Sequence, residues 1–252
     1  PKNLLDEAIT LLFAGQDTSA ATLSWTLHLL SLAPDVQTKL AHHVRQVLRD
    51  ECVDSTDGGT IPKRILSKMT YLDAVVKEAM RLYPVAPFVV RRLPFDLTVS
   101  DDDESRRNHG STDEMKPPTK VTIPANTVTC IWIYSLHRHP AFWTNPNDFV
   151  PNRWLHSDGN RTKEVDVGIT NGAYMPFAAG PRNCVGQPLA HVILRTLLAR
   201  LVTTFDFCDP RLSPDASNAR SLQKDMQAGF TVLPAGGVEL IMRERTWGES
   251  TL

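Results

Sequence analysis

The sequence predicts a mainly α-helical fold with small β-sheets. Long stretches carry apolar residues at three- and four-residue spacing, which is the pattern of an amphipathic helix. Prolines mark the ends of several of these stretches, and short runs rich in β-branched residues lie between and after them. The 252 residues suffice for one large domain or two small ones, and the hydrophobic content of 42% is ordinary for a soluble globular protein.

Charge and cysteine content narrow the class of protein. The net charge is -1, so nothing indicates a nucleic-acid partner or an anionic membrane surface. The four cysteines are far apart and form no Cys-x-x-Cys pair, so we expect reduced thiols in a protein that faces the cytosol. The longest uncharged run, 18–34, contains His28 and many hydroxyl groups and is too polar to span a bilayer, and we find no signal peptide.

The first predicted helix covers residues 4–33 and ends at Pro34. Gly15 lies inside it and costs about 1 kcal/mol there relative to Ala, while neighbouring hydroxyl residues compete for backbone carbonyls. We therefore expect a local distortion with a groove beside Gly15. The alternative is a patch of small residues where a second helix crosses closely.

Two further amphipathic helices are predicted over 35–52 and 71–82, and Pro84 closes the second. His42 and His43 could suggest a metal site in the first of them. No third residue has the spacing of a metal ligand, so we interpret this pair as part of a solvated face.

Short runs rich in β-branched residues predict the sheets. Residues 96–100 and 121–124 are expected to form a strand pair. Between them, residues 101–118 are polar and charged, which predicts a disordered surface insertion. Other segments with extended or β-like character are 85–90, 127–133, 229–234 and 237–242.

A cysteine lies in a glycine-containing loop directly before a fourth predicted helix, 187–202. Backbone N–H groups and the positive end of the helix dipole would stabilise a thiolate at Cys184. Gly180 and Gly186 allow tight turns that point amides at the sulfur, and Arg182 can pair with an anionic group. Such a loop fits heme iron held by cysteine. The alternative for an isolated cysteine is a buried structural thiol.

This stretch resembles the heme-binding signature of the cytochrome P450 family, Phe-x-x-Gly-x-Arg-x-Cys-x-Gly, at every specified position. Some members carry Gly where Ala178 stands. The resemblance implies that Cys184 is the axial ligand of the heme iron and that Arg182 pairs with a heme propionate. The other cofactor-binding residues of this loop would be Phe177, Gly180 and Gly186.

The stretch 14–19 looks like the oxygen-binding helix of the family, in which Asp17 and Thr18 form the catalytic acid–alcohol pair. Cleavage of the O–O bond needs two protons. A hydroxyl can hold the oxygen and an ordered water, while a carboxylate relays protons from solvent. One branch of the family attaches heme covalently through a Glu at the position of Ala14, so Ala here predicts non-covalent heme b.

Two more motifs of the family follow in its order. Glu78 and Arg81 match Glu-x-x-Arg, and Arg153 lies in a match to Phe-x-Pro-x-Arg-Phe/Trp over 149–154. In the family, Arg153 would reach back to the other two. A buried carboxylate with two guanidiniums is costly to break, so the resemblance implies a structural trio that fixes the core presenting Cys184. The alternative for Glu78 and Arg81 alone is an exposed ion pair.

His137 and His139 could bind a metal, but the segment 137–143 resembles the packing motif His-Arg-x-Pro-x-x-Trp of the family, which we favour. The resemblance also places the segment 85–90 over the heme. Its substrate-lining candidates are Phe88, Val89 and Val90, with Phe230 as a weaker candidate in a second pocket loop. Arg91 would meet a heme propionate, and the adjacent Arg92 competes for that role.

The resemblance covers the chain apart from the insertion and implies that residues 1–252 are the C-terminal part of a single cytochrome P450 domain. The implied protein is a heme-thiolate monooxygenase that inserts one oxygen atom of O₂ into a small apolar organic substrate, such as a lipid or fatty acid. No flavin or nicotinamide signature is found, so the electrons would come from a separate NADPH-dependent reductase.

The family resemblance implies a longer full-length protein on the cytosolic face of the endoplasmic reticulum membrane. Its N-terminal part would hold the membrane anchor and much of the substrate pocket. Two alternatives stand beside the monooxygenase. The chain could be a non-catalytic truncated fragment that binds heme weakly or not at all, or a heme-thiolate isomerase that needs no reductase. The Asp17–Thr18 pair argues for monooxygenation.

Overall fold

The computed structural model describes residues 2–52, 61–100, 120–155, 172–212, 225–229 and 231–247. The chain falls into two compact units, and each is described by itself. The larger comprises Pro1–Pro87 with Ile133–Leu252, and the smaller is Phe88–Trp132. The insertion predicted at 101–118 lies outside the described residues. That all 252 residues belong to one domain stays a prediction.

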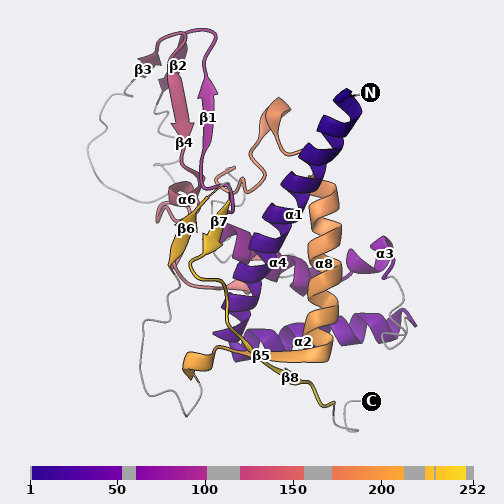
Figure 1. Cartoon of the computed structure of the whole chain (residues 1–252). Helices are drawn as coiled ribbons and strands as arrows, with labels where there is room; N and C mark the ends of the chain where they lie inside the picture. Colours follow the sequence, from indigo (N-terminus) through magenta and orange to yellow (C-terminus); the bar gives the residue numbers. More distant parts are fainter. Residues whose placement is uncertain are drawn as a thin grey trace, which may run out of the picture. The chain divides into compact units, whose positions relative to one another are not determined.

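The larger unit is mainly helical, which confirms the predicted class (Figure 1). Its α-helices are α1 (Lys2–Ser31), α2 (Pro34–Asp50), α3 (Lys63–Leu66), α4 (Thr70–Leu82), α6 (Ile133–Leu136) and α8 (Gln187–Thr204). Its short 3-10 helices are η1 (Pro151–Trp154), η2 (Gly180–Arg182) and η3 (Pro210–Leu212). The four long helices lie where the periodicity predicted them, with small changes at their ends.

Helix α1 runs unbroken through Gly15, unlike the local distortion expected there. The hydroxyl of Thr18 donates to the carbonyl of Ala14 at 2.7 Å, and that of Thr22 donates to Thr18 at 2.9 Å. The hydroxyls thus bond within the helix without ending it. A Cβ added at Gly15 would meet no described atom within 4 Å, so the alternative, a close helix crossing, is not found among these residues either.

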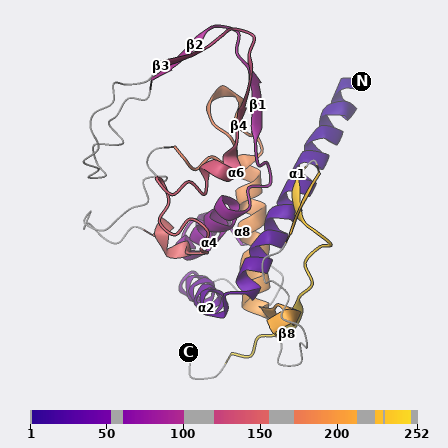
Figure 2. The same ribbon diagram turned by 90° about the vertical axis from the view of Figure 1, so that its left-hand side faces the viewer.

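The core of the larger unit lies among four helices. In Figures 1 and 2, α1 and α8 run side by side, and α2 and α4 pack against them. The fully buried residues at their contacts include Leu30 of α1, Leu40 of α2, Leu72 of α4 and Leu198 of α8. Burying each such side chain contributes about 1.5–3 kcal/mol. This core fixes α8, whose first turn follows the cysteine loop.

All described sheets are two-stranded and antiparallel. In the larger unit, β5 (Phe205–Cys208) pairs with β8 (Ile241–Glu244), and β6 (Met226–Ala228) pairs with β7 (Val232–Pro234). In the smaller unit, β1 (Val89–Arg92) pairs with β4 (Val128–Ile131), and β2 (Leu97–Ser100) pairs with β3 (Lys120–Ile123). The predicted strand pair is therefore found, with slightly different ends.

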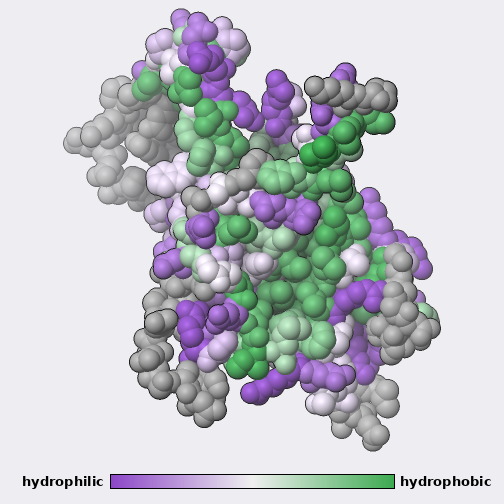
Figure 3. Space-filling view, in the orientation of Figure 1, coloured by the Kyte–Doolittle hydropathy of each residue, from purple (hydrophilic) through white to green (hydrophobic). Residues whose placement is uncertain are grey.

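One surface of the larger unit is apolar. Figure 3 shows apolar side chains gathered over α1 and α8 on the face in view. The exposed apolar residues of the first half of α1 are Leu4, Leu5, Ile9, Leu11, Leu12 and Phe13. Among the helices that the structure describes, none combines the length and apolar character needed to cross a membrane.

Candidate functional site

The stretch 177–186 is a tight loop that the backbone closes on itself. The amide of Cys184 donates to the carbonyl of Phe177 at 3.0 Å, and the amide of Asn183 donates to Gly180 at 3.1 Å. Two residues adopt left-handed backbone angles, Gly180 with φ +77° and Ala178 with φ +58°. Gly tolerates this region without strain, whereas Ala pays about 1–2 kcal/mol for the contact of Cβ with a carbonyl oxygen. The position where some family members carry Gly is therefore one that favours Gly.

The thiol of Cys184 is free and exposed, two residues before the N-cap of the 18-residue helix α8. Among the described residues, the amides of Val185 and Gly186 have no backbone acceptor, as is usual at a helix N-terminus. A Cβ added at Gly186 would lie 3.7 Å from the sulfur, so the absence of a side chain leaves that flank of Sγ uncovered. An exposed sulfur beside free amides and an uncovered flank fits a heme-iron ligand.

Packing holds the start of this loop. The ring of Phe177 is half-buried against the main core, and its centroid lies 5.2 Å from the ring of His191 on α8. Burial lowers the pKa of His191, and the nearby positive charge of Arg195 lowers it further. Arg182 is exposed on η2, where it is free to meet an anionic group.

The left-handed backbone at Ala178 predicts that replacing this residue by Gly stabilises the protein. Ala178→Gly should relieve about 1–2 kcal/mol of strain and lose about 0.4–1 kcal/mol through the greater freedom of Gly in the unfolded chain. We expect a net gain of about 0–1.6 kcal/mol in the free energy of unfolding, measured by urea denaturation. Gly180→Ala is the matched change and should lower it by a similar amount. A loss of stability in Ala178→Gly would contradict the left-handed conformation at Ala178.

Asp17 and Thr18 are adjacent on α1, but their side chains have different partners. The hydroxyl of Thr231 donates to Oδ2 of Asp17 at 2.6 Å, while Thr18 donates to the carbonyl of Ala14. Thr231 is buried and directly precedes β7. Nothing in the sequence indicated this partner beyond its place in a suspected pocket loop.

The strand that follows Thr231 is tied to α1 and to the segment after α4. The indole of Trp25 donates to the carbonyl of Val232 at 2.9 Å, and the amide of Val232 donates to Val85 at 2.9 Å. Trp25 is fully buried and stacks on Tyr83 with ring centroids 3.8 Å apart. Because Trp25 lies two turns after Asp17, one face of α1 holds this strand through both residues.

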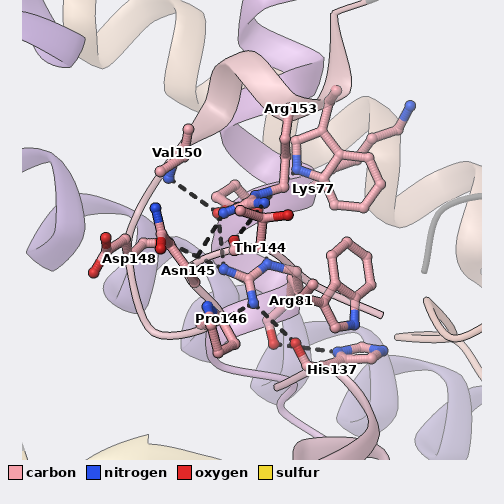
Figure 4. A network of polar contacts seen from close by, with 12 residues as sticks. Lys77, Arg81, His137, Thr144, Asn145, Pro146, Asp148, Val150 and Arg153 are labelled. Carbon is pink, nitrogen blue, oxygen red and sulfur yellow. Dashed lines mark hydrogen bonds and ion pairs between the residues drawn. The ribbon is translucent and has the colours of Figure 1, made fainter. Parts of the chain in front are cut away.

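Glu78, Arg81 and Arg153 meet in a buried network, of which Figure 4 labels the two arginines. Arg81 grips both carboxylate oxygens of Glu78, through Nε and Nη2 at 2.9 Å each, and Arg153 Nε lies 3.0 Å from Oε1. The side chains of Glu78 and Arg81 are fully buried. The carboxylate also accepts from the indole of Trp154 at 2.9 Å and from the amide of Val150 at 3.0 Å. Its charge is therefore met by donors from α4, η1 and the residue before η1.

Arg81 also binds backbone carbonyls of a distant segment. Its Nη1 donates to His137 at 2.8 Å and to Pro146 at 2.7 Å, and its Nη2 donates to Asp148 at 3.0 Å. Figure 4 shows these carbonyls around the guanidinium. The sequence motif predicted the trio but not these carbonyl partners, which belong to a loop without regular structure.

The remaining candidates lie in the smaller unit or outside the described residues. Phe88 and Val90 are exposed, and the guanidinium of Arg91 donates to the carbonyl of Val90 at 2.8 Å. Arg92 is exposed as well. The substrate and propionate roles of these residues stay predictions. Phe230 lies outside the described residues.

Comparison with known proteins gives one family. The family model of cytochrome P450 matches residues 1–103 and 105–231. The chain is 33% identical over 202 residues to cytochrome P450 4d8 of Drosophila melanogaster, covering 80% of this chain and 37% of that protein. It is 34% identical over 201 residues to cytochrome P450 3A6 of Oryctolagus cuniculus (80% and 34%), and 30% identical over 238 residues to human cytochrome P450 4X1 (94% and 39%). The chain thus spans between a third and two-fifths of the length of these relatives.

Proposed function

This chain belongs to the cytochrome P450 family, and we propose that it is the heme-binding and oxygen-activating part of a heme-thiolate monooxygenase. The observation that carries the proposal is the setting of Cys184. Its exposed sulfur precedes α8 in a loop closed by the 3.0 Å hydrogen bond to Phe177, and no side chain at Gly186 covers it. The loop lies at the positive end of α8, which is a suitable place for the negative charge of a metal-bound sulfur.

The residues of the larger unit would hold heme b as follows. Cys184 would ligate the iron, and Arg182 would pair with a propionate through charge-assisted hydrogen bonds. The porphyrin would otherwise be held without covalent attachment. Bound heme would supply O₂ activation and transfer of one oxygen atom to an organic substrate. For the smaller unit, we propose that Arg91 contributes a propionate contact and that Phe88, Val89 and Val90 line the substrate side.

Asp17 and Thr18 would hold and transfer protons on the oxygen-binding side of the heme. Since Thr18 donates its proton to Ala14, the lone pairs of its hydroxyl oxygen are free to accept from an ordered water. The carboxylate of Asp17, held by Thr231, would exchange protons with that water and with solvent.

We expect Thr18→Ala to lower the product formed per electron consumed by about 10-fold or more, because general acid–base steps contribute about 10²–10⁴-fold. Thr18→Ser keeps the hydroxyl and should retain most of the coupling. The measurement compares electron consumption with product in the heme-loaded protein supplied with a reductase. Unchanged coupling in Thr18→Ala would refute the proton-handling role.

The partners and location are proposed from the family. Electrons would come from a separate NADPH-dependent reductase, and the substrate would be a small apolar organic molecule, with lipids and fatty acids as candidates. The protein would act on the cytosolic face of the endoplasmic reticulum membrane, with membrane contact through residues N-terminal to this chain.

The alternative is a non-catalytic fragment that binds heme weakly or not at all. The exposed apolar residues on the first half of α1 favour this alternative, because an uncovered apolar surface promotes association and local unfolding. Limited proteolysis and size-exclusion chromatography separate the two. Rapid cleavage throughout the chain, or soluble aggregates only, would favour the fragment.

The deciding experiment uses the reduced, CO-bound protein. The chain is expressed with heme, reduced and exposed to carbon monoxide, and the Soret band is recorded. A strongly red-shifted band reports thiolate ligation, and we expect Cys184→Ala to abolish it while Cys130→Ala, another exposed thiol, leaves it unchanged. A band at the position typical of histidine ligation in wild type would contradict the proposed Cys184 ligand. The absence of any band would favour the fragment.

A further inference from the structure

His137 is a fully buried histidine whose two ring nitrogens both have partners. It directly follows α6, and its ring stacks on Tyr174 with centroids 5.3 Å apart. Nε2 lies 2.9 Å from the backbone nitrogen of Met175, and Nδ1 lies 3.2 Å from the carbonyl oxygen of Arg81. Both nitrogens are therefore engaged by backbone groups, which leaves no lone pair for the metal ligation considered from the sequence.

These contacts determine the tautomer of the ring. A backbone amide can only donate, so Nε2 must accept from Met175 and carry no proton. A carbonyl can only accept, so Nδ1 must carry the single proton and donate it to Arg81. The neutral Nδ1–H form satisfies both contacts, whereas the Nε2–H tautomer would face two groups with the wrong polarity.

On one side, the ring is continuous with the buried network. Arg81 accepts from His137 through its backbone carbonyl and donates to the carbonyl of His137 through Nη1 at 2.8 Å. The same guanidinium holds both oxygens of Glu78. His137 is thus attached twice to the residue at the centre of the network.

On the other side, the ring is continuous with the cysteine loop. Met175 donates to His137 and accepts at its own carbonyl from the amide of Ala178 at 3.0 Å. Phe177, between these two residues, accepts from the amide of Cys184 at 3.0 Å. The turn that closes the loop therefore begins at the residue that His137 holds.

We infer that His137 is a positioning residue for Cys184: its neutral, Nδ1-protonated ring ties the first turn of the cysteine loop to the Glu78–Arg81–Arg153 network. The inference rests on the proposed function in one respect only, namely that Cys184 is a heme ligand. The tie itself consists of contacts within this chain, so it can be tested without heme.

Two isosteric variants separate the two nitrogens. His137→Gln keeps an acceptor near the position of Nε2, and His137→Asn keeps a donor near the position of Nδ1 only. The readout is amide hydrogen exchange, by NMR, of Met175 and Cys184 in the heme-free chain. We expect His137→Asn, which removes the acceptor of the Met175 amide, to speed exchange of both amides about tenfold. His137→Gln keeps that acceptor but loses the donor to Arg81, so we expect it to speed exchange less.

Control amides and a control histidine accompany these variants. The amide of Phe207 in β5, which donates to the side chain of Gln37, should keep its exchange rate in both variants. His139 is an exposed histidine two residues away, and His139→Gln should leave the exchange rates of all three amides unchanged. If His137→Asn speeds exchange of the Met175 amide but not of the Cys184 amide, the contact of His137 with Met175 has only a local effect, and the positioning role is overturned. If His137→Asn changes the exchange rate of neither amide, the proposed link between the network and the cysteine loop is overturned.

The wild-type ring supplies a test that needs no variant. Nitrogen chemical shifts of His137 at neutral pH should show a protonated Nδ1 and an unprotonated Nε2, and the opposite tautomer would overturn the inference even if His137→Asn failed to fold. In the reduced, CO-bound protein, His137→Asn should also lower the fraction of red-shifted Soret band relative to His137→Gln. A wild-type chain without that band would refute the proposed function and leave the exchange results to decide the tie.

Discussion

Glu78→Ala is expected to lower the free energy of unfolding by about 3–5 kcal/mol, a large part of the stability of an ordinary domain. Removing the carboxylate leaves the guanidinium of Arg81 fully buried without its counter-charge. Arg153 loses the same acceptor, and so do the indole of Trp154 and the amide of Val150. An uncompensated buried charge costs several kcal/mol, far more than the net contribution of an ordinary hydrogen bond.

A surface carboxylate with two cations gives the matched control. Glu51 pairs with Arg64 and Lys68, whose side chains are mostly exposed, and both cations help to lower its pKa. Water can solvate these groups when the carboxylate is removed, so Glu51→Ala should change stability little. Urea denaturation of both variants measures the contrast. Similar losses in the two would mean that the Glu78 network is solvated and does not fix the core.

The helices could be predicted from the sequence because their signals are local. Apolar spacing placed α1, α2, α4 and α8, although Pro34 has a different role from the one predicted. It begins α2 at a position where its missing N–H costs nothing, rather than directly ending α1. The single-turn helices α3 and α6 escaped prediction because four residues carry too little periodicity.

Strand pairing depends on contacts that are distant in the sequence. The β2–β3 pair was predictable because two β-rich runs flank one polar segment. The pairing of Val89 with Ile131, and of Phe205 with Glu244, joins residues far apart along the chain. Strand propensity indicates that such a run is extended but does not choose its partner.

In the functional site, too, local sequence features were predictable and contacts between distant residues were not. Short motifs identified Cys184, Glu78 and Arg81, because the residue types at fixed spacing carry the chemistry. They could not identify Thr231 as the partner of Asp17, which lies 214 positions earlier. His137 was interpreted as a packing residue, and only the three-dimensional contacts of its ring nitrogens reveal a link to the cysteine loop.

The second large expected effect is a loss of stability on acidification that originates at His137. The pKa of His137 is lowered to about 4, mainly by burial and in smaller part by the positive charges of Arg81 and Arg138, although hydrogen bonds to the carbonyls of Arg81 and Met80 act in the opposite direction. Tyr174, stacked on the ring, is half-buried and uncharged, because desolvation raises its pKa well above the ordinary value. No charge on these neighbours therefore favours the imidazolium.

The direction of this stability change follows from proton binding in the folded and unfolded states. The pKa of His137 is lower in the folded protein, so between pH 6.5 and about 4 the unfolded chain binds the proton and the folded chain does not. The stabilisation from keeping His137 neutral is complete above pH 6.5 and is lost as the pH falls through this window. It amounts to about 3 kcal/mol, since each pKa unit corresponds to about 1.4 kcal/mol.

Urea denaturation between about pH 7 and about pH 4 measures this loss as a difference between proteins. His137→Gln cannot titrate at this position, so its stability should fall less steeply with acidification than that of wild type, by about 3 kcal/mol over the window. Carboxylates shared by both proteins cancel in the comparison. His139→Gln removes an exposed histidine and should follow the wild-type curve. Parallel curves for wild type and His137→Gln would show that the buried ring accepts a proton without opening the fold. Such a ring could not be the neutral link, donating to Arg81 and accepting from Met175, on which the placement of Cys184 is argued to depend.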